Sequence, residues 1–123
     1  MWGNPSFAKA PEWLYWSVYY SYILLSSKSH IFYYGYTSDL RNRFNLHNTG
    51  KVFSTKPYTP WKLVWYGSFD SEQEAKDFEQ YLKSGSGKAF AYKRLVSGVL
   101  KKDVKARQNL RCSIAEGEGH HVG

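Results

Sequence analysis

The chain has 123 residues, which suits one domain of ordinary size. Its 17 Lys and Arg residues outnumber its 10 Asp and Glu residues, and the formal net charge of +7 predicts a polyanionic partner, nucleic acid before an anionic membrane surface. Cys112 is the one cysteine, which excludes an intrachain disulfide and a cysteine-rich zinc site; because the N-terminus also lacks a secretory pattern, we expect a cytoplasmic protein.

Two runs of aromatic and β-branched residues, 18–25 and 31–36, predict two strands that form a hairpin. Residues 26–29 between them have turn composition. If the turn contains two or four residues, Tyr22 and Tyr33 lie directly opposite each other on one face, whereas a five-residue loop would place them on different faces. We take the shared face as our hypothesis. Neither run is long enough to span a bilayer, and we expect no membrane partner.

A helix follows the hairpin, from an N-cap at Ser38 or Asp39 to about Asn48. Leu40 and Phe44 lie one turn apart and are expected to form its buried stripe. The glycine two residues after the helix is a typical end signal.

Arg43 and His47 lie on a neighbouring face of the same helix, because they too are four residues apart. A planar guanidinium suits phosphate oxygens, and the histidine one turn later could meet the same phosphate. Taken singly, an arginine on a short helix is more often solvated, and a lone histidine is more often structural or exposed.

A third strand is predicted over residues 62–69, and a capping box begins the helix after it, with Ser71 as the cap and Glu74 three residues on. This helix extends to about residue 83 and has an apolar stripe. The stripe consists of Ala75, Phe78 and Leu82. Glycines then break the helix, and residues 88–96 predict a short last one.

Glu79 lies beside that apolar stripe, where a carboxylate needs a partner because burying its charge alone is costly. A divalent metal ion is one such partner, since Mg²⁺ binds through one or two carboxylates plus substrate phosphates. The alternative is a solvated glutamate paired with Lys83, four residues later. Tyr22 and Tyr33 are likewise either plain sheet aromatics or phenols that orient water or pass a proton.

These elements predict an α+β fold, a small three-stranded antiparallel sheet flanked by helices in the order β-β-α-β-α-α. We divide the chain into an N-terminal arm (1–16), one domain (17–97) and a C-terminal tail (98–123) that is first basic and then mildly acidic. Periodicity fades from Gly98 onward, so we expect this tail to be frayed.

Basic residues interleaved with aromatic ones could follow a nucleic-acid backbone and stack on its bases. The candidate nucleic-acid contacts are Arg41, Lys51, Lys56, Lys62 and Lys88, with Phe53, Tyr58 and Trp61 between them. The alternative is a set of solvated cations with no binding role.

Taken in order, these residues resemble the GIY-YIG nuclease superfamily, close to its small stand-alone bacterial members and to the N-terminal nuclease module of the excinuclease C subunit. The resemblance spans about residues 17–95. It rests on Tyr20-Ser21-Tyr22 as the first triplet, Tyr33-Tyr34-Gly35 as the second, the run from Gly35 to Leu40, then Arg43, His47-Asn48, Glu74-Ala75 and Glu79. Tyr20, Ser21 and Tyr34 stand where the family triplets have glycine and isoleucines.

The resemblance implies an endonuclease that hydrolyses DNA, in repair or another processing step, with one Mg²⁺ or Mn²⁺ held by Glu79. It makes Tyr22 and Tyr33 the motif tyrosines, Arg43 the phosphate-binding residue and His47 an auxiliary polar group. The sequence does not decide which tyrosine deprotonates the attacking water. Two other functions stay open: a nucleic-acid-binding module of the same fold without activity, and an adaptor whose exposed Trp and Tyr side chains bind a protein.

Overall fold

A computed structural model describes residues 18–110, so the expected N-terminal arm and residues 111–123 lie outside the described part of the chain. Its centre is a three-stranded antiparallel sheet in the order β2-β1-β3. The strands are β1 (Tyr19–Ser26), β2 (Phe32–Thr37) and β3 (Trp61–Phe69). Each begins within one residue of its expected position, because runs of aromatic and branched residues fit a pleated, half-buried surface.

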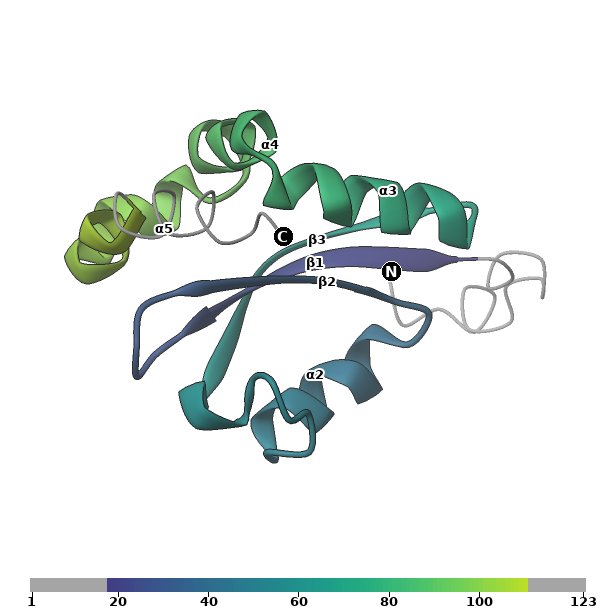
Figure 1. The fold of residues 1–123 in the computed structure, drawn as a ribbon, viewed down its shortest axis with the longest axis horizontal. Coiled ribbons are helices and arrows are strands. Elements are labelled where there is room, and N and C mark those ends of the chain that lie inside the picture. Colours follow the sequence, from purple (N-terminus) through teal and green to yellow (C-terminus); the bar gives the residue numbers. More distant parts are fainter. Residues whose placement is uncertain (1–17, 111–123) are drawn as a thin grey trace, which may run out of the picture.

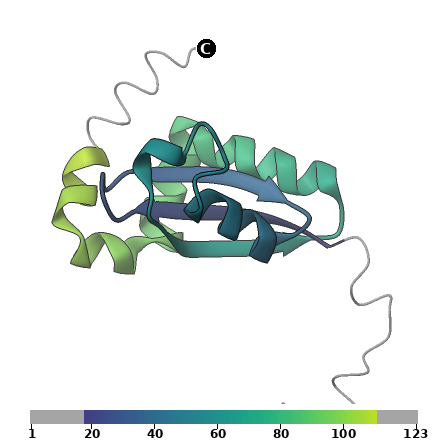
Figure 2. The same ribbon diagram turned by 90° about the horizontal axis from the view of Figure 1, so that it is seen from below.

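Helices cover both faces of the sheet (Figures 1 and 2). One face carries α2 (Leu40–Asn48) and the short 3-10 helix η2 (Lys56–Tyr58). The other face carries α3 (Glu72–Lys83), α4 (Gly85–Phe90), the π-helical segment η3 (Ala91–Leu95) and α5 (Ser97–Lys102). The α+β architecture expected from the sequence is therefore confirmed. None of the helices within residues 18–110 is long and apolar enough to cross a membrane.

The hairpin register differs from the expected one by two residues. Tyr22 pairs with Gly35 and Tyr33 pairs with Leu24, so the two tyrosines do not lie directly opposite each other. The Ser26 side chain accepts hydrogen bonds from the backbone N–H groups of two turn residues, which holds the turn tightly and lets β1 continue to Ser26. Because the offset is an even number of residues, Tyr22 and Tyr33 still share a face, as we proposed.

Side chains alternate along β1 and build a separate core on each face. Tyr22 and Leu24 pack with Trp61 beneath α2, where the expected stripe of Leu40 and Phe44 joins them. On the opposite face, residues of β1 and β2 pack against the helices that follow β3. This core comprises Ile23, Leu25, Tyr34, Leu82, Ala91, Val96, Leu100 and Ala106.

Two of the three unusual triplet residues, Ser21 and Tyr34, belong to the face of the sheet that holds α3. Ser21 is fully buried and its hydroxyl donates to the carbonyl oxygen of Ala75 at 2.7 Å, which fixes α3 on the sheet. Tyr34 is buried in the core beside Tyr92, and burial raises the pKa of its phenol. Both substitutions thus have structural consequences on the face away from Tyr22.

The end of the domain differs from the sequence-based expectation in two ways. First, α4 begins at Gly85, three residues earlier than predicted, because the Ser84 side chain caps it by accepting from the N–H of Gly87 at 3.1 Å. Gly87 is required there, since a Cβ at this position would lie 1.6 Å from the carbonyl oxygen of Tyr81.

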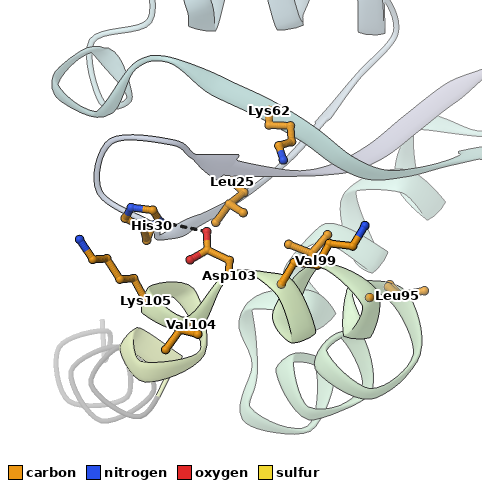
Figure 3. A pocket seen from close by; sticks show the side chains of 10 residues that line it. Leu25, His30, Lys62, Leu95, Val99, Asp103, Val104 and Lys105 are labelled. Atoms are coloured by element: carbon orange, nitrogen blue, oxygen red, sulfur yellow. Dashed lines mark hydrogen bonds and ion pairs between the residues drawn. The ribbon is translucent and has the colours of Figure 1, made fainter.

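Second, residues 98–110 are not frayed: α5 is followed by another helical segment over residues 104–110. The Asp103 side chain caps that segment and also lies 2.9 Å from Nδ1 of His30 in the hairpin turn. Asn109 donates to the carbonyl oxygens of Ser29 and His30. His30 and Asp103 line a hollow of about 700 Å³ between the turn and these helices. Figure 3 shows the pair with its hydrogen bond as a dashed line. These contacts hold residues 104–110 against the hairpin turn, and no hydrophobic periodicity in the sequence predicts them.

Candidate active site

Helix α2 buries a histidine against the sheet. Asp39 caps the helix by accepting from the N–H of Asn42 at 3.1 Å, and Leu40 and Phe44 fix its position over the sheet. His47 is then placed in the interior with no exposed surface, deeper than the apolar residues of the same helix. A fully buried imidazole must have its polar atoms satisfied, and both ring nitrogens have partners.

His47 links a strand tyrosine to a loop threonine. Its Nε2 lies 2.9 Å from the Tyr22 hydroxyl and its Nδ1 lies 2.8 Å from Oγ1 of Thr55. Thr55 donates its own proton to the carbonyl oxygen of Val52, so its oxygen is left to accept from Nδ1–H. We therefore assign the Nδ1–H tautomer, in which Tyr22 donates to the free Nε2.

The buried histidine is neutral at physiological pH. Burial and, to a lesser extent, the positive charge of Arg43 together lower the pKa of His47 to about 4. A neutral imidazole has a free acceptor nitrogen, and here that nitrogen points at Tyr22.

The pKa of Tyr22 is raised to about 12, mainly by burial and to a lesser extent by Tyr33. The Arg43 guanidinium opposes this rise by hydrogen bonding to the phenol and by its charge, while the carboxylate of Glu79 contributes a small further increase. The Tyr22 oxygen thus lies 2.9 Å from an acceptor, Nε2 of His47, and is under the influence of the positive charge of Arg43.

Gly35 makes the space that Tyr22 occupies. The Tyr22 ring crosses β2 at this residue, its partner across the strands, and a Cβ on Gly35 would lie 2.5 Å from the Tyr22 hydroxyl oxygen. Atoms that close cannot coexist, so any other residue would displace the ring from its place beside His47. Gly35 therefore determines how the phenol reaches the edge of the sheet.

Tyr33 completes an aromatic cluster around the imidazole. Its ring centroid lies 6.4 Å from that of Tyr22, 5.0 Å from that of His47 and 6.1 Å from that of Trp61. The indole N–H of Trp61 donates to the carbonyl oxygen of Thr55 at 3.1 Å, which holds the loop that carries the Thr55 hydroxyl. Tyr33 is half-buried, whereas Tyr22 has almost no exposed surface.

Glu79 approaches this group from the helix on the opposite face of the sheet. Its side chain is only 8% exposed and forms an ion pair with Lys83. The pairing matches one alternative drawn from the sequence, but the glutamate is not solvated as that alternative required. Its influence on the Tyr22 pKa places it within electrostatic reach of the phenol.

Glu79 offers an isolated carboxylate, not a preformed cage. Residues 18–110 contain no group of three or more His, Cys, Asp or Glu side chains able to hold an ion. One nearly buried carboxylate fits Mg²⁺ or Mn²⁺ that keeps several waters and completes its coordination with phosphate oxygens. The ion would have to compete with Lys83 for the carboxylate.

Of the residues proposed for catalysis, the structure brings Tyr22, Tyr33 and His47 into one cluster. Arg43 lies one turn before His47 on α2, Glu79 comes from α3 on the opposite face, and the residues proposed for nucleic-acid contact lie apart. Arg41, Lys51 and Lys56 lie on or just after α2, on the face of the active-site group. Lys62 lines the hollow beside α5, and Lys88 lies near Tyr34 and Tyr92 under the C-terminal helices. The five cations therefore do not form one continuous track.

Thr55 and Gly35 were not assigned functions by sequence reasoning. Thr55 lies in an irregular loop without periodicity, and only its contact with His47 reveals it. Gly35 had a detectable signal, because it closes the second triplet, where a glycine inside a strand often marks close backbone or side-chain approach.

Comparison with known proteins identifies a family for the region that contains this site. The family model described as the GIY-YIG catalytic domain matches residues 18–93. A UPF0213 protein of Streptococcus agalactiae serotype V is 39% identical over 71 residues, 57% of this chain and 80% of the relative. The UPF0213 protein YazA of Bacillus subtilis is 36% identical over 63 residues, 50% of this chain and 64% of YazA. No solved structure matches significantly.

Proposed function

The chain belongs to the GIY-YIG family, a family of nucleases, and from this we propose that it is a metal-dependent endonuclease that hydrolyses phosphodiester bonds in DNA, in repair or another processing step. One observation carries the proposal: the Tyr22 hydroxyl is hydrogen-bonded to a neutral buried histidine, and Arg43 and Glu79 both act on its pKa. These residues come from three separate elements, and a structural role alone does not require them to converge.

Arg43 would bind the phosphate to be cleaved. Its guanidinium lies beside the Tyr22 phenol, and a planar fork of donors suits the phosphate oxygens. Charge increases on those oxygens as the attacking water adds, so a fixed cation there stabilises the transition state more than the ground state.

Tyr22 would accept a proton from the attacking water while passing its own proton to Nε2 of His47. A phenol with a pKa of about 12 is a poor donor to bulk water but can act as a relay to the adjacent imidazole. Thr55 keeps Nδ1 protonated, so Nε2 is the nitrogen able to receive the proton. Negative charge growing on the phosphate favours the resulting imidazolium. Of the two motif tyrosines, Tyr22 is thus the better candidate for the general base.

Glu79 would hold the single Mg²⁺ or Mn²⁺, which when bound supplies positive charge to the developing phosphate and the leaving oxygen. Lys83 neutralises the carboxylate when no ion is there. Its flexible ammonium is half exposed, so it can turn to solvent when the carboxylate takes a different partner.

A nucleic-acid-binding module without cleavage activity is the second candidate. The ion pair between Glu79 and Lys83 favours it, because the carboxylate already has a partner that satisfies its charge. The two candidates predict the same DNA affinity and differ in whether Mg²⁺ leads to cleavage.

A plasmid assay separates them. Supercoiled DNA is incubated with wild-type protein, Glu79→Gln and the matched control Glu72→Gln, whose side chain is exposed on the same helix. We expect nicking by the wild type and by the control only in Mg²⁺ or Mn²⁺, and none by Glu79→Gln, with DNA binding retained by all three. Equal nicking by Glu79→Gln contradicts the metal site, and no nicking by the wild type contradicts the nuclease.

A further inference from the structure

A second hollow lies on the active-site face of the sheet, along the other side of α2. Its volume is about 610 Å³, within the range of roughly 300–1,000 Å³ usual for small-molecule sites. Arg41 and Asn45 project from α2 about half a turn away from Arg43, because successive residues rotate by about 100°. The lining that matters here is Tyr20, Tyr66, Phe44, Leu63, Arg41 and Asn45, which we call the aromatic groove.

Two tyrosines form the sheet side of the aromatic groove. The ring centroids of Tyr20 and Tyr66 lie 6.2 Å apart at an interplanar angle of 58°, and Tyr66 is 55% exposed. A large aromatic side chain this exposed offers a ring face that the protein itself does not cover. Flat aromatic ligands stack on such faces.

The aromatic groove adjoins the candidate active site. Tyr66 is the cross-strand partner of Tyr22, and Tyr20 lies two residues before Tyr22 on the same strand. Adjacent strands are about 4.8 Å apart, and the Tyr22 hydroxyl lies over Gly35 of β2, on the far side of β1 from Tyr66. A ligand stacked on Tyr66 therefore lies about two strand spacings, roughly 10 Å, from the phenol oxygen proposed to deprotonate water. One strand of nucleic acid could therefore contact both places around the N-terminal turn of α2.

The polar residues of the aromatic groove fit a nucleotide. The Arg41 guanidinium can pair with a phosphate, and the Asn45 amide, with donors and an acceptor, can pair with the edge of a base. Asp39 also lines the groove, but its carboxylate already accepts the N–H of Asn42 as the helix cap. The excess positive charge of the chain favours an anionic occupant over a neutral aromatic one.

We propose that the aromatic groove binds an unpaired nucleobase through stacking on Tyr66 and Tyr20, with its phosphate on Arg41. This inference rests on the proposed nuclease function. Under that function, the preferred substrate is a DNA strand with unpaired bases next to the cleaved bond, such as a single strand or a flap. Bases in a duplex are stacked on their neighbours and cannot enter the groove.

Binding is tested without cleavage, by NMR titration of metal-free Glu79→Gln protein with dAMP and, separately, with deoxyribose 5-phosphate. We expect dAMP to shift the signals of Tyr66, Tyr20 and Asn45, and deoxyribose 5-phosphate to leave the tyrosine signals in place. Equal shifts from both compounds would show a phosphate contact only, and no shift from dAMP would remove the site; either result overturns the proposal.

Variants then connect the aromatic groove to the substrate. Base stacking is worth roughly 1–3 kcal/mol, so Tyr66→Ala should weaken binding of a single-stranded oligonucleotide about tenfold, while Tyr66→Phe keeps the ring and the affinity. The control is Tyr81→Ala, a 40% exposed tyrosine on α3. If the wild-type protein cleaves DNA, Tyr66→Ala should slow cleavage of a flap and leave the rate of cleavage of an intact duplex unchanged. Equal losses on both substrates overturn the proposal, while a protein that does not cleave at all still gives the binding result.

Discussion

Replacing Thr55 with valine tests the hydrogen-bond chain from Tyr22 through His47. Valine keeps the volume of threonine but removes the oxygen that accepts from Nδ1–H of His47 at 2.8 Å. Both residues are almost fully buried, so water does not replace the lost acceptor. An unpaired buried N–H costs about 1–3 kcal/mol of folding free energy. For a domain near this size, each kcal/mol changes the Tm by roughly 4–8 °C, so Thr55→Val should melt at least about 4 °C below the wild type.

The loss of the Thr55 hydroxyl should also change the hydrogen bond between His47 and the Tyr22 phenol. Without its partner at Nδ1, the imidazole is free to move its proton to Nε2, which then donates to the Tyr22 oxygen in place of accepting from it. General-base assistance is worth about 10²–10⁴ in rate, so we expect DNA cleavage to fall about 100-fold. Thr55→Ser keeps the hydroxyl and should restore both the rate and the tautomer.

Two measurements read these effects separately. Imidazole ¹⁵N shifts at neutral pH report which nitrogen of His47 carries the proton, and single-turnover cleavage of labelled DNA reports the rate. A Thr55→Val protein that keeps the Nδ1–H tautomer and the wild-type rate would refute the positioning role. A lower Tm with an unchanged tautomer would leave Thr55 as a packing residue.

Three further variants test neighbouring contacts. Gly35→Ala places a Cβ 2.5 Å from the Tyr22 oxygen, so this variant should lose about 1–3 kcal/mol of stability and most of its activity. The control Gly98→Ala, where nothing lies near the added Cβ, should change neither property. Denaturant unfolding measures the stability, and a Gly35→Ala protein as stable as the wild type would contradict the close approach. The pKa of His47 is lower in the fold than its ordinary 6.5, so its contribution to stability is present above pH 6.5 and is lost, by up to about 3 kcal/mol, as the pH falls toward 4. The pKa of Asp103 is held below its ordinary 3.8, so the contribution of Asp103 is lost only at a lower pH, and His47→Gln should flatten the profile between pH 6.5 and 4; an unchanged profile would contradict burial of the neutral imidazole. Lys83→Met frees the Glu79 carboxylate and should lower the Mg²⁺ concentration needed for half-maximal cleavage. Lys76→Met is the exposed control on the same helix, and equal Mg²⁺ requirements for the two variants would mean that the ion pair does not compete with the metal.

The sequence predicted the elements of this fold well because their signals are local. Aromatic and branched runs define the strands, and the Ser71 side chain accepts from the N–H of Glu74 as the capping box requires. The hairpin register depends instead on how Ser26 binds the turn, a contact that composition does not reveal. The helices over residues 97–110 are short and are held by Asp103 and Asn109, whose partners lie more than 70 residues away.

The geometry of the candidate site could be predicted from the sequence only in part. Arg43 and His47 share a helix face by spacing, but spacing placed His47 beside the apolar stripe and not deeper than Leu40 and Phe44. The burial arises because Tyr22 and Thr55 satisfy both ring nitrogens, and those partners come from a strand and a loop. Long-range pairing of this kind leaves no mark in local sequence.

Single-turnover cleavage of labelled DNA in Mg²⁺, comparing wild-type protein with Tyr22→Phe and Tyr33→Phe, tests the central claim most directly. Each change removes one hydroxyl and preserves the ring, so packing and DNA binding should stay the same. We predict that the wild type cleaves, that Tyr22→Phe slows the reaction by about 100-fold or more, and that Tyr33→Phe slows it less. Cleavage by Tyr22→Phe within about threefold of the wild type, less than 0.7 kcal/mol of barrier, would contradict the account.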